Sequence, residues 1–549
     1  MSPIFKYNNE SEVIMPIIQS QISITSKEFL ANKEAFQKRV EELHRRRGEV
    51  KLGGPEKARE LHKKRNQMMV RDRIKALCDP GSPFLELGML VGLDLHNNEL
   101  PSGGFITGVG LIHGRRCMIL AHDATVKGGS YYALTAKKHV RAQMYAWKHR
   151  LPCITLVQSG GANLPEQPGI FPDDGQMGSI FYNQIMMSAE GIPQIAIVHG
   201  PSTAGGAYMP ALCDEAVIVR EQGYMYLGSP TLVEAATGEI VDAESLGGGE
   251  MHCKVSGVTD HLAENDSHAI AITRDIVERL GNKPEMRWQV AEAMPPRHDP
   301  AEIYGLINHD HRIPNDTHEI LCRLIDDSNL QEFKPHYGDT LICGFARIMG
   351  FEIGILANKG VLFGESALKG AHFISLCCQR DIPLLFMADV SGFMVGREAE
   401  QTGIAKHGAK LISAMAAAKV PKYTVVIGGD YGAGYLAMCG RAFKPDALFN
   451  WPNARTALMG PDQAAMVLAG VRQGIYDREG NTWPEDEKEK YKQMVRDDFD
   501  AFANAYNFAA HLWSDDILDP VETREVLALH LDIAGRCPAE ETRFPVFRF

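Results

Sequence analysis

Two short glycine-rich runs contain the residues whose backbone could do chemistry. They are Ala204–Tyr208, which reads Ala-Gly-Gly-Ala-Tyr, and Gly432–Tyr435, which reads Gly-Ala-Gly-Tyr. Each run follows an apolar segment typical of a buried strand and precedes a helical pattern, so its first amides lack a carbonyl partner. Two such N–H groups can form an oxyanion hole, where each donor contributes about 3–4 kcal/mol of transition-state stabilisation. We predict one hole at Gly205 and Gly206, and another at Ala433 and Gly434.

The alternative is that these glycines only allow a helix to pack closely against a strand, which explains most single Gly-Gly pairs. No side-chain constellation competes with the amides, because the chain has no G-x-S-x-G elbow, no H-E-x-x-H motif and no Walker A loop. The recurrence of the run in both halves of the chain favours a chemical role. Chemistry by backbone amides, with no evident protein base, suggests that the base arrives with a substrate or cofactor.

An internal repeat connects the two runs. Pro152 is separated from Pro383 by the same interval as Gly161 from Gly392, and the interval from Pro193 to Pro421 is only slightly shorter. The glycine-rich runs are offset by the same interval as Pro193 and Pro421. Landmarks that keep register to within three residues indicate a duplicated domain, with two tandem β/α units.

The elements that would position the runs follow from periodicity. Short β-branched runs predict strands near 104–110, 117–121, 154–158 and 194–198, and the pattern of Leu134–His149 predicts a helix. Residues 281–320 are rich in Pro, His and Asp and are expected to form a linker. A charged helical insertion is expected at 476–500, and a final amphipathic helix near Pro520–Ile533. The predicted domains are an arm (1–26), an N-terminal unit (27–290) and a C-terminal unit (291–549).

Composition limits the class of protein. A chain of 549 residues with 45% hydrophobic and 23% charged residues is globular, and a net charge of −12 argues against a nucleic-acid binder. Residues 27–75 are the exception, with 16 Lys and Arg against 8 Asp and Glu. This segment is expected to form two helices broken at Gly53-Gly54-Pro55, either as a solvated face or as a docking site for an anionic partner.

Cysteine and histidine spacing argues against a metal. None of the eleven Cys forms a C-x-x-C pair, so we expect reduced thiols and no metal site.

Every apolar run is shorter than a membrane-spanning helix requires, and no targeting segment is evident, although Met15 could be an alternative start. The expected location is the cytoplasm.

Longer motifs identify a family resemblance. The chain from about Arg71 to Phe549 resembles the carboxyltransferase (β) subunits of biotin-dependent acyl-CoA carboxylases, in the branch that carboxylates 3-methylcrotonyl-CoA and geranyl-CoA. The motifs that carry the resemblance are Ser159–Pro165, Thr203–Tyr208, Gly228–Pro230, Gly247–Gly248, Ser256–Val258, Gly392–Gly396, Gly403–Lys406, Met438–Arg441 and Trp451–Arg455.

The resemblance implies an α/β fold of tandem duplicated crotonase-like (ClpP/crotonase) ββα superhelical domains. It implies that the amides of Gly205 and Gly206 hold the thioester oxygen of an acyl-CoA as its enolate, and that those of Ala433 and Gly434 hold the ureido oxygen of carboxybiotin. Biotin, carried on a partner subunit, would supply CO2 and the base that removes the γ-proton. The substrate-binding residues implied in this way are Gly160, Gly161, Ala162, Met177, Ala204, Gly392 and Phe393.

The resemblance also implies partners. A biotin carboxylase/biotin carrier (α) subunit is expected, because this chain has no biotinylation motif and no ATP-binding domain, and no metal or nucleotide is expected on it. The two holes belong to different units, which fits a head-to-tail dimer within a β6 ring of an α6β6 assembly. Two other functions stay open, namely a CoA-ester decarboxylase subunit of the same fold and a non-catalytic scaffold for a biotin-carrying subunit.

The acyl group is the feature that the motifs leave open. Asp173–Ser179 departs from the 3-methylcrotonyl pattern by the loss of a ring and a long side chain, which predicts a roomier pocket around Met177. This tilts the prediction towards geranyl-CoA, with neutral drift of the loop as the alternative.

Overall fold

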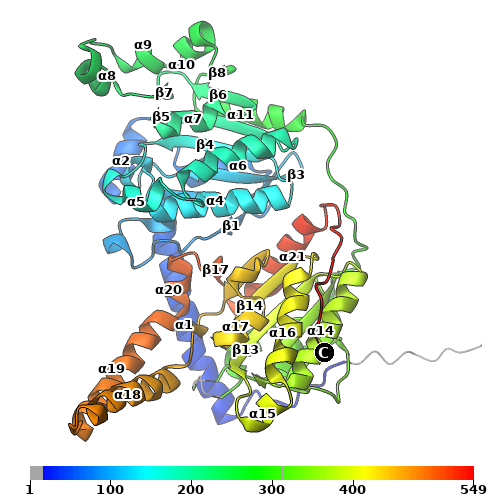
Figure 1. The fold of residues 1–549 in the computed structure, drawn as a ribbon. Helices are drawn as coiled ribbons and strands as arrows, with labels where there is room; N and C mark the ends of the chain where they lie inside the picture. The colour runs from blue at the N-terminus through cyan, green and yellow to red at the C-terminus, as the bar shows by residue number, and fades with distance from the viewer. Residues whose placement is uncertain (1–16, 309, 311–312, 549) are drawn as a thin grey trace, which may run out of the picture.

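The computed structural model describes residues 17–308, 310 and 313–548. Residues 1–16 of the predicted arm, Met15 among them, lie outside the described residues. The described chain forms two α/β units, each built around one sheet, which occupy the upper and lower parts of Figure 1. Among the described residues, no helix is both long and apolar enough to cross a bilayer.

The first sheet has eight strands in the order β1-β2-β3-β4-β5-β6-β8, with β7 paired to β5. β2 and β3 form an antiparallel hairpin, and β3 to β6 run parallel, with β8 parallel to β6. All four predicted strands are confirmed, as β2 to β5. The bounds are β1 Leu85–Leu87, β2 Phe105–Ile112, β3 Arg115–His122, β4 Cys153–Ser159, β5 Gln194–Thr203, β6 Glu215–Val219, β7 Tyr224–Tyr226 and β8 His261–Ala263.

The second sheet repeats this plan with nine strands, seven in the order β17-β15-β14-β13-β11-β10-β9, with β12 paired to β13 and β16 paired to β14. Its hairpin is β10–β11, and β16 pairs with β14 as β7 pairs with β5. The predicted duplication is therefore confirmed in the topology. The bounds are β9 Gln331–Glu332, β10 Leu341–Ile348, β11 Phe351–Asn358, β12 Gly360–Leu362, β13 Leu384–Phe393, β14 Lys422–Tyr431, β15 Ala447–Asn450, β16 Arg455–Ala457 and β17 Asp516–Ile517.

Corresponding helices cover the sheets. In the first unit α4 (Ala133–Lys148), the helix predicted at 134–149, packs against α6 (Met177–Ala189), and α7 (Gly205–Ala211) follows β5. In the second unit α14 (Gly364–Gln379) packs against α16 (Ile404–Ala417), and α17 (Gly432–Ala437) follows β14. Both glycine-rich runs therefore begin a helix directly after a parallel strand, as predicted.

The basic N-terminal segment forms α1 (Lys27–Lys51) and α2 (Glu56–Lys64), broken where predicted. α1 buries Phe29, Phe36 and Val40 in a core cluster of the second unit, although it precedes the first unit in the chain. Arg46 forms an ion pair with Asp94, and Arg47 forms one with Glu522. Part of the positive charge is thus neutralised within the chain.

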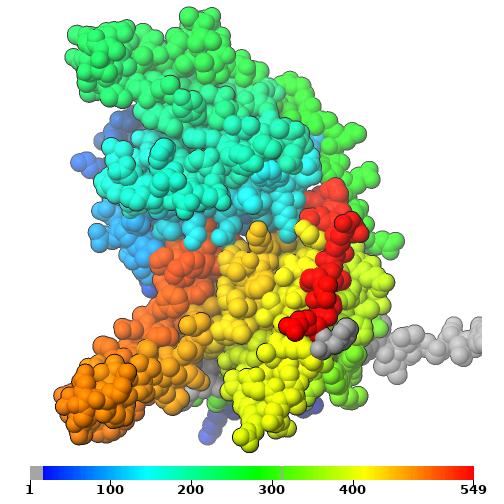
Figure 2. Space-filling model, viewed as in Figure 1, coloured from blue at the N-terminus to red at the C-terminus, as the bar shows by residue number. Residues whose placement is uncertain are grey.

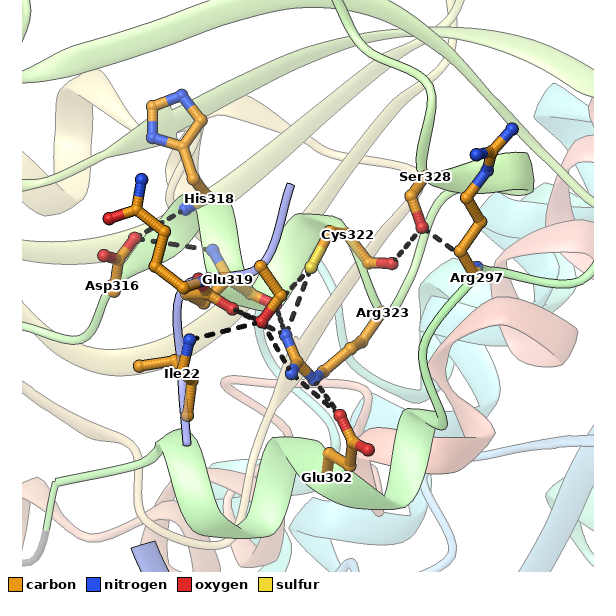
Figure 3. A network of polar contacts seen from close by, with 11 residues as sticks. Ile22, Arg297, Glu302, Asp316, His318, Glu319, Cys322, Arg323 and Ser328 are labelled. Atoms are coloured by element: carbon orange, nitrogen blue, oxygen red, sulfur yellow. Dashed lines mark hydrogen bonds and ion pairs between the residues drawn. The ribbon is translucent and has the colours of Figure 1, made fainter. Parts of the chain in front are cut away.

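The described residues before α1 also belong to the second unit, as Figure 3 shows. The hydroxyl of Ser20 and the amide of Gln21 donate to the Glu319 carboxylate at 2.7 Å. Arg323 joins the network through Glu319 and Glu302, at 2.8 and 2.7 Å. Partly buried hydrogen bonds therefore anchor this stretch to the C-terminal half.

The segment between the sheets is shorter than the predicted linker. α11 (Asp266–Glu278) ends the first unit, and neither helix nor strand occupies 281–299. α12 (Ile303–Leu306) and α13 (Thr317–Leu321), expected within the linker, contribute core residues to the second unit. The boundary near residue 290 falls in the extended part and stays a prediction.

Two helical features complete the second unit. The helix predicted at 476–500 corresponds to α19 (Glu485–Ala503) and the last residues of α18 (Pro461–Arg478), with a break between them. The two helices form a hairpin that projects from the second unit in Figures 1 and 2. The predicted final helix is α21 (Thr523–Ala534), whose Ile533 and Leu531 lie in core clusters of different units. The C-terminal segment after α21 runs down over the surface of the second unit (Figure 2), where Glu540 forms an ion pair with Lys419.

Candidate active site

The first amide turn joins β5 to α7. Ala204 has φ +54° and ψ −124°, an unusual conformation for a residue with a side chain, and the helix starts at Gly205. The amide of Ala204 donates to the Tyr226 carbonyl at 3.1 Å, and that of Ala207 donates to the Ala204 carbonyl at 3.0 Å. Between them, the amides of Gly205 and Gly206 have no hydrogen-bond partner within the part of the chain that the structure describes. Two adjacent N–H groups are therefore available to an anion.

Crowding explains the two glycines. A β-carbon on Gly206 would lie 2.9 Å from both the β-carbon and Oγ of Ser159, so a side chain there would displace the turn. A β-carbon on Gly205 would lie 2.9 Å from the Met177 methyl carbon and 3.7 Å from the Phe181 ring. Met177, which the resemblance implied as a substrate-binding residue, is the first residue of α6 and lies directly beside the first turn.

The second amide turn joins β14 to α17. Gly432 takes the position of Ala204 with φ +56°, and a β-carbon there would lie 2.8 Å from the Leu458 carbonyl oxygen. A β-carbon on Gly434 would lie 2.7 Å from a γ-carbon of Val390 and 3.3 Å from the α-carbon of Gly392. Within the described residues, the amides of Ala433 and Gly434 also have no partner.

The same strand irregularity creates both turns. In β4–β5 the register passes from Val157↔Val198 to Ser159↔Ser202, so β5 contains two extra residues. In β13–β14 it passes from Ala388↔Val426 to Val390↔Asp430, again with two extra residues in the later strand. Such a bulge bends the strand and redirects the residues after it. The bulged strands thus deliver the glycine-rich runs to equivalent places.

The predicted loop Gly160–Ala162 lies beside the first turn. Gly161, with φ +85°, donates its amide to Ser159 Oγ at 3.2 Å and accepts from the Tyr131 amide at 2.8 Å. A β-carbon on Gly161 would lie 3.6 Å from the Thr203 carbonyl oxygen, and one on Gly160 would lie 2.9 Å from Ser130 Oγ. The structure therefore brings Gly160, Gly161, Met177 and Ala204 to the turn at Gly205–Gly206, and Ala162 is bridged to Tyr131.

Sequence reasoning missed a buried polar network behind this loop. The Tyr131 hydroxyl lies 2.8 Å from Nδ1 of His139 and 3.1 Å from Nε2 of His122. His122 Nδ1 contacts the Leu156 carbonyl oxygen at 3.3 Å. Burial lowers the pKa of His122 from 6.5 to about 4 and the pKa of His139 well below its ordinary value, so both rings are neutral near pH 7. These residues share no motif spacing that could have identified them.

An apolar cluster that contains Tyr131 and Met177 lies against the first turn. Its buried members are Tyr131, Ala136, Ile170, Met177, Ile180 and Met209, with Ala133, Val140 and Phe181 packed against them. Met177 and Met209 make this surface adaptable, because an unbranched thioether side chain fills irregular spaces. The cluster therefore forms an apolar surface beside Gly205 and Gly206.

A groove of about 560 Å³ lies next to the predicted residues of the second unit. Gly392 (φ +133°) touches the turn at Gly434, and the Phe393 ring packs 3.1 Å from a β-carbon built on Gly408. The groove opens between the loop that follows Phe393 and the starts of α14 and α16. Its lining includes Tyr337, Phe363, Met394, Arg397, Ile404 and His407. Among the described residues, no three His, Cys, Asp or Glu side chains form a group that could hold a metal.

Residues 61–544 match the family described as the carboxyl transferase domain. The chain belongs to this carboxyltransferase family. It is 52% identical over 509 residues to the biotin-dependent 3-methylcrotonyl-coenzyme A carboxylase beta1 subunit of Mycobacterium tuberculosis, covering 93% of this chain and 96% of that one. It is 48% identical to the probable mitochondrial methylcrotonoyl-CoA carboxylase beta chain of Drosophila melanogaster, with 97% and 95% coverage.

Among solved structures, the chain is similar to the β subunit of P. aeruginosa geranyl-CoA carboxylase. The TM-score is 0.87 at 39% identity, and the match covers 97% of this chain and 100% of that one. These comparisons confirm the family resemblance drawn from the motifs, and they confirm the duplicated crotonase-like fold of this carboxyltransferase.

Proposed function

We propose that this carboxyltransferase is the β subunit of a biotin-dependent acyl-CoA carboxylase and transfers CO2 from carboxybiotin to the γ-carbon of a branched α,β-unsaturated acyl-CoA. The observation that carries the proposal is the pair of equivalent turns, each with two unpartnered amides. The amides of Gly205 and Gly206 would hold the thioester oxygen as charge develops on it, beside the apolar cluster around Met177.

The second turn fits a ureido oxygen, which accepts N–H donors as a thioester oxygen does. The amides of Ala433 and Gly434 would hold it, with Gly392 and Phe393 beside the turn and the adjoining groove open to a carrier. When bound, carboxybiotin supplies CO2 and a base, which fits a site whose own contribution is backbone N–H groups. The turns exclude a side chain at Gly206 and Gly434, so these residues let the ligand oxygens approach the amides.

Assembly is part of the proposal. The two turns lie in different units of one chain (Figure 1), so a head-to-tail dimer would bring the first turn of one protomer to the second turn of its partner. Exposed apolar side chains support contacts between protomers, with Phe171 and Tyr182 in the first unit and Leu458, Met466 and Val471 in the second. We extend this to a β6 core bound to biotin-carrying α subunits, in the cytoplasm. If light scattering showed a monomer and that monomer were fully active, this assembly would be contradicted.

The finer substrate assignment is geranyl-CoA, ahead of 3-methylcrotonyl-CoA. It is supported by the adaptable methionines at the first turn. The names of the relatives contain both kinds of acyl-CoA and favour neither. The test is reconstitution with the biotin-carrying subunit, followed by kcat/KM for the two thioesters. ATP- and bicarbonate-dependent carboxylation is expected. Decarboxylation with a membrane partner would favour the decarboxylase alternative, and activity insensitive to the turns would favour a scaffold.

A further inference from the structure

Behind the first amide turn, a hydroxyl group holds the helix in place. Ser202 on β5 pairs with Ser159 on β4 and is fully buried. Its Oγ donates a hydrogen bond to the Gly206 carbonyl at 2.7 Å. This bond satisfies a carbonyl of the same glycine whose amide faces the ligand side. It therefore ties the orientation of the Gly206 peptide units to β5.

The corresponding residue in the second unit is Asp430, which follows Ser202 by the same offset that separates the two glycine-rich runs. It pairs with Val390 on β13 as Ser202 pairs with Ser159 on β4, after the same two-residue bulge. The γ-carbons of Val390 lie 2.7 and 2.9 Å from a β-carbon built on Gly434, so Val390 faces α17. Because directly paired residues of neighbouring strands share a face of the sheet, Asp430 also faces α17.

Asp430 is buried without compensation. Its exposed fraction is 0%, neither carboxylate oxygen has a hydrogen-bond partner, and among the described residues no cation pairs with it. Thr456, its register partner on β16, also has a buried hydroxyl without a partner. An ionised carboxylate in such a place is strongly disfavoured, whereas a neutral carboxyl group tolerates burial and has a proton to donate.

The neighbouring titratable groups add no stabilising charge. They are Asp389 on β13, Tyr431 on β14, Tyr435 on α17 and Arg455 on β16, of which Arg455 lies 3.9 Å from Asp500 on α19. Asp389 is itself occupied, since it accepts from the amide and side chain of Asn315 and from the Gly429 amide, each at 2.9 Å. Burial and the Asp389 charge raise the pKa of Asp430 well above its ordinary value.

We propose that Asp430 is a neutral carboxylic acid and the positioning residue of the second amide turn, where its O–H takes the role of the Ser202 hydroxyl. Its acceptor is the Gly434 carbonyl, the counterpart of the Gly206 carbonyl. A carbonyl oxygen beside an ionised carboxylate is repelled, whereas beside a carboxylic acid it accepts a hydrogen bond. A further advantage rests on the proposed function: a neutral Asp430 keeps a negative charge away from amides that must stabilise an anion.

Infrared spectroscopy of the full chain tests the protonation state without any assay. The wild-type protein at neutral pH should show the C=O stretching band of a protonated carboxyl group, and Asp430→Asn and Asp430→Ser should each lose it. If neither substitution removes such a band, Asp430 is ionised and the proposal is overturned. This readout is independent of the proposed function.

Activity of the reconstituted complex tests the positioning role. Asp430→Ala should lower the carboxyl-transfer rate at least about tenfold, and Asp430→Ser should recover most of it, because the hydroxyl can donate again. The wild-type rate should fall above the pH at which Asp430 ionises, a fall that Asp430→Ser should not show. If the Ser variant is folded but as slow as the Ala variant, a donated hydrogen bond from residue 430 does not position the turn and the proposal is wrong. If Gly434→Val leaves carboxylation unchanged, the proposed function fails instead, and the infrared result stands.

Discussion

Ala204 and Gly432 occupy the same position in the two units, with φ +54° and +56°, yet only the first has a side chain. Ala204 is exposed, whereas a β-carbon on Gly432 would meet the Leu458 carbonyl oxygen at 2.8 Å. Behind the turns, Ser159 and Ser202 of the first unit correspond to Val390 and Asp430 of the second. Both turns thus have a positive φ at the same position and follow the same register shift, while the side chains around them differ.

The largest expected effect comes from closing either turn. Gly206→Val and Gly434→Val should each lower overall carboxylation at least about 10²-fold, because each obstructs two anion-binding amides. Gly206→Val should retain release of CO2 from the carboxylated carrier, and Gly434→Val should lose it. Gly48→Val is the matched control, since a β-carbon on this helical residue meets no atom within 4 Å. Identical losses in both half-reactions would mean that the turns do not have separate ligands.

The next effect concerns the acyl chain. Met177→Phe places a ring beside Gly205, so it should shorten the pocket of the first unit and leave the second unchanged. A methylene excluded from an apolar pocket is worth about 1–3 kcal/mol, so kcat/KM for geranyl-CoA should fall at least about tenfold relative to 3-methylcrotonyl-CoA. The measurement is this ratio before and after the substitution. An unaltered ratio would show that the acyl chain does not reach Met177.

A smaller effect tests the left-handed position itself. Gly432→Ala should destabilise the protein by about 1–2 kcal/mol from the positive φ, and more if Leu458 cannot move. Ala204→Gly should be nearly neutral or stabilising, because it relieves the same conformation at an exposed site. Thermal denaturation of the two variants gives the comparison. Equal destabilisation by both would argue that the turns are not equivalent.

The smallest effect is a response to acid in the first unit. His122 pairs with Phe105 in the first hairpin as Asn358 pairs with Leu341 in the second, so a titratable ring corresponds to an amide. Since the folded pKa of His122 is lowered to about 4, the unfolded chain binds more protons below pH 6.5, and stability falls as the pH drops towards 4. At pH 5.5 His122 alone should account for a loss of about 1 kcal/mol, to which the lowered pKa values of His139 and His199 add. Denaturant unfolding at pH 7.5 and 5.5 measures it, and a first-unit transition independent of pH would contradict it.

The sequence allowed prediction of what is local or repeated. Pro and Gly mark the ends of the buried strands, and the constant offset between the repeats identified both turns, at Gly206 and Gly434. The packing of α1 was not predictable, because Phe29 and Phe36 contact residues near 303–325 that no periodicity connects to them. The Tyr131 network was also missed, since His122 and His139 meet it only through the fold. The offset alone would have aligned Asp430 with Ser202, but the burial of Asp430 could not be predicted from the sequence.

The docking of residues 17–26 and of α1 on the second unit has a consequence for synthesis. Ser20 precedes its partner Glu319 by 299 residues, so at about 5–20 residues per second the ribosome needs roughly 15–60 s to supply that partner. For most of this time α1 is already synthesised, but the core residues of the second unit that cover Phe29, Phe36 and Val40 are not. The first helix of the chain is thus among the last to find its place, and a nascent chain stalled before residue 319 is a natural client for chaperones.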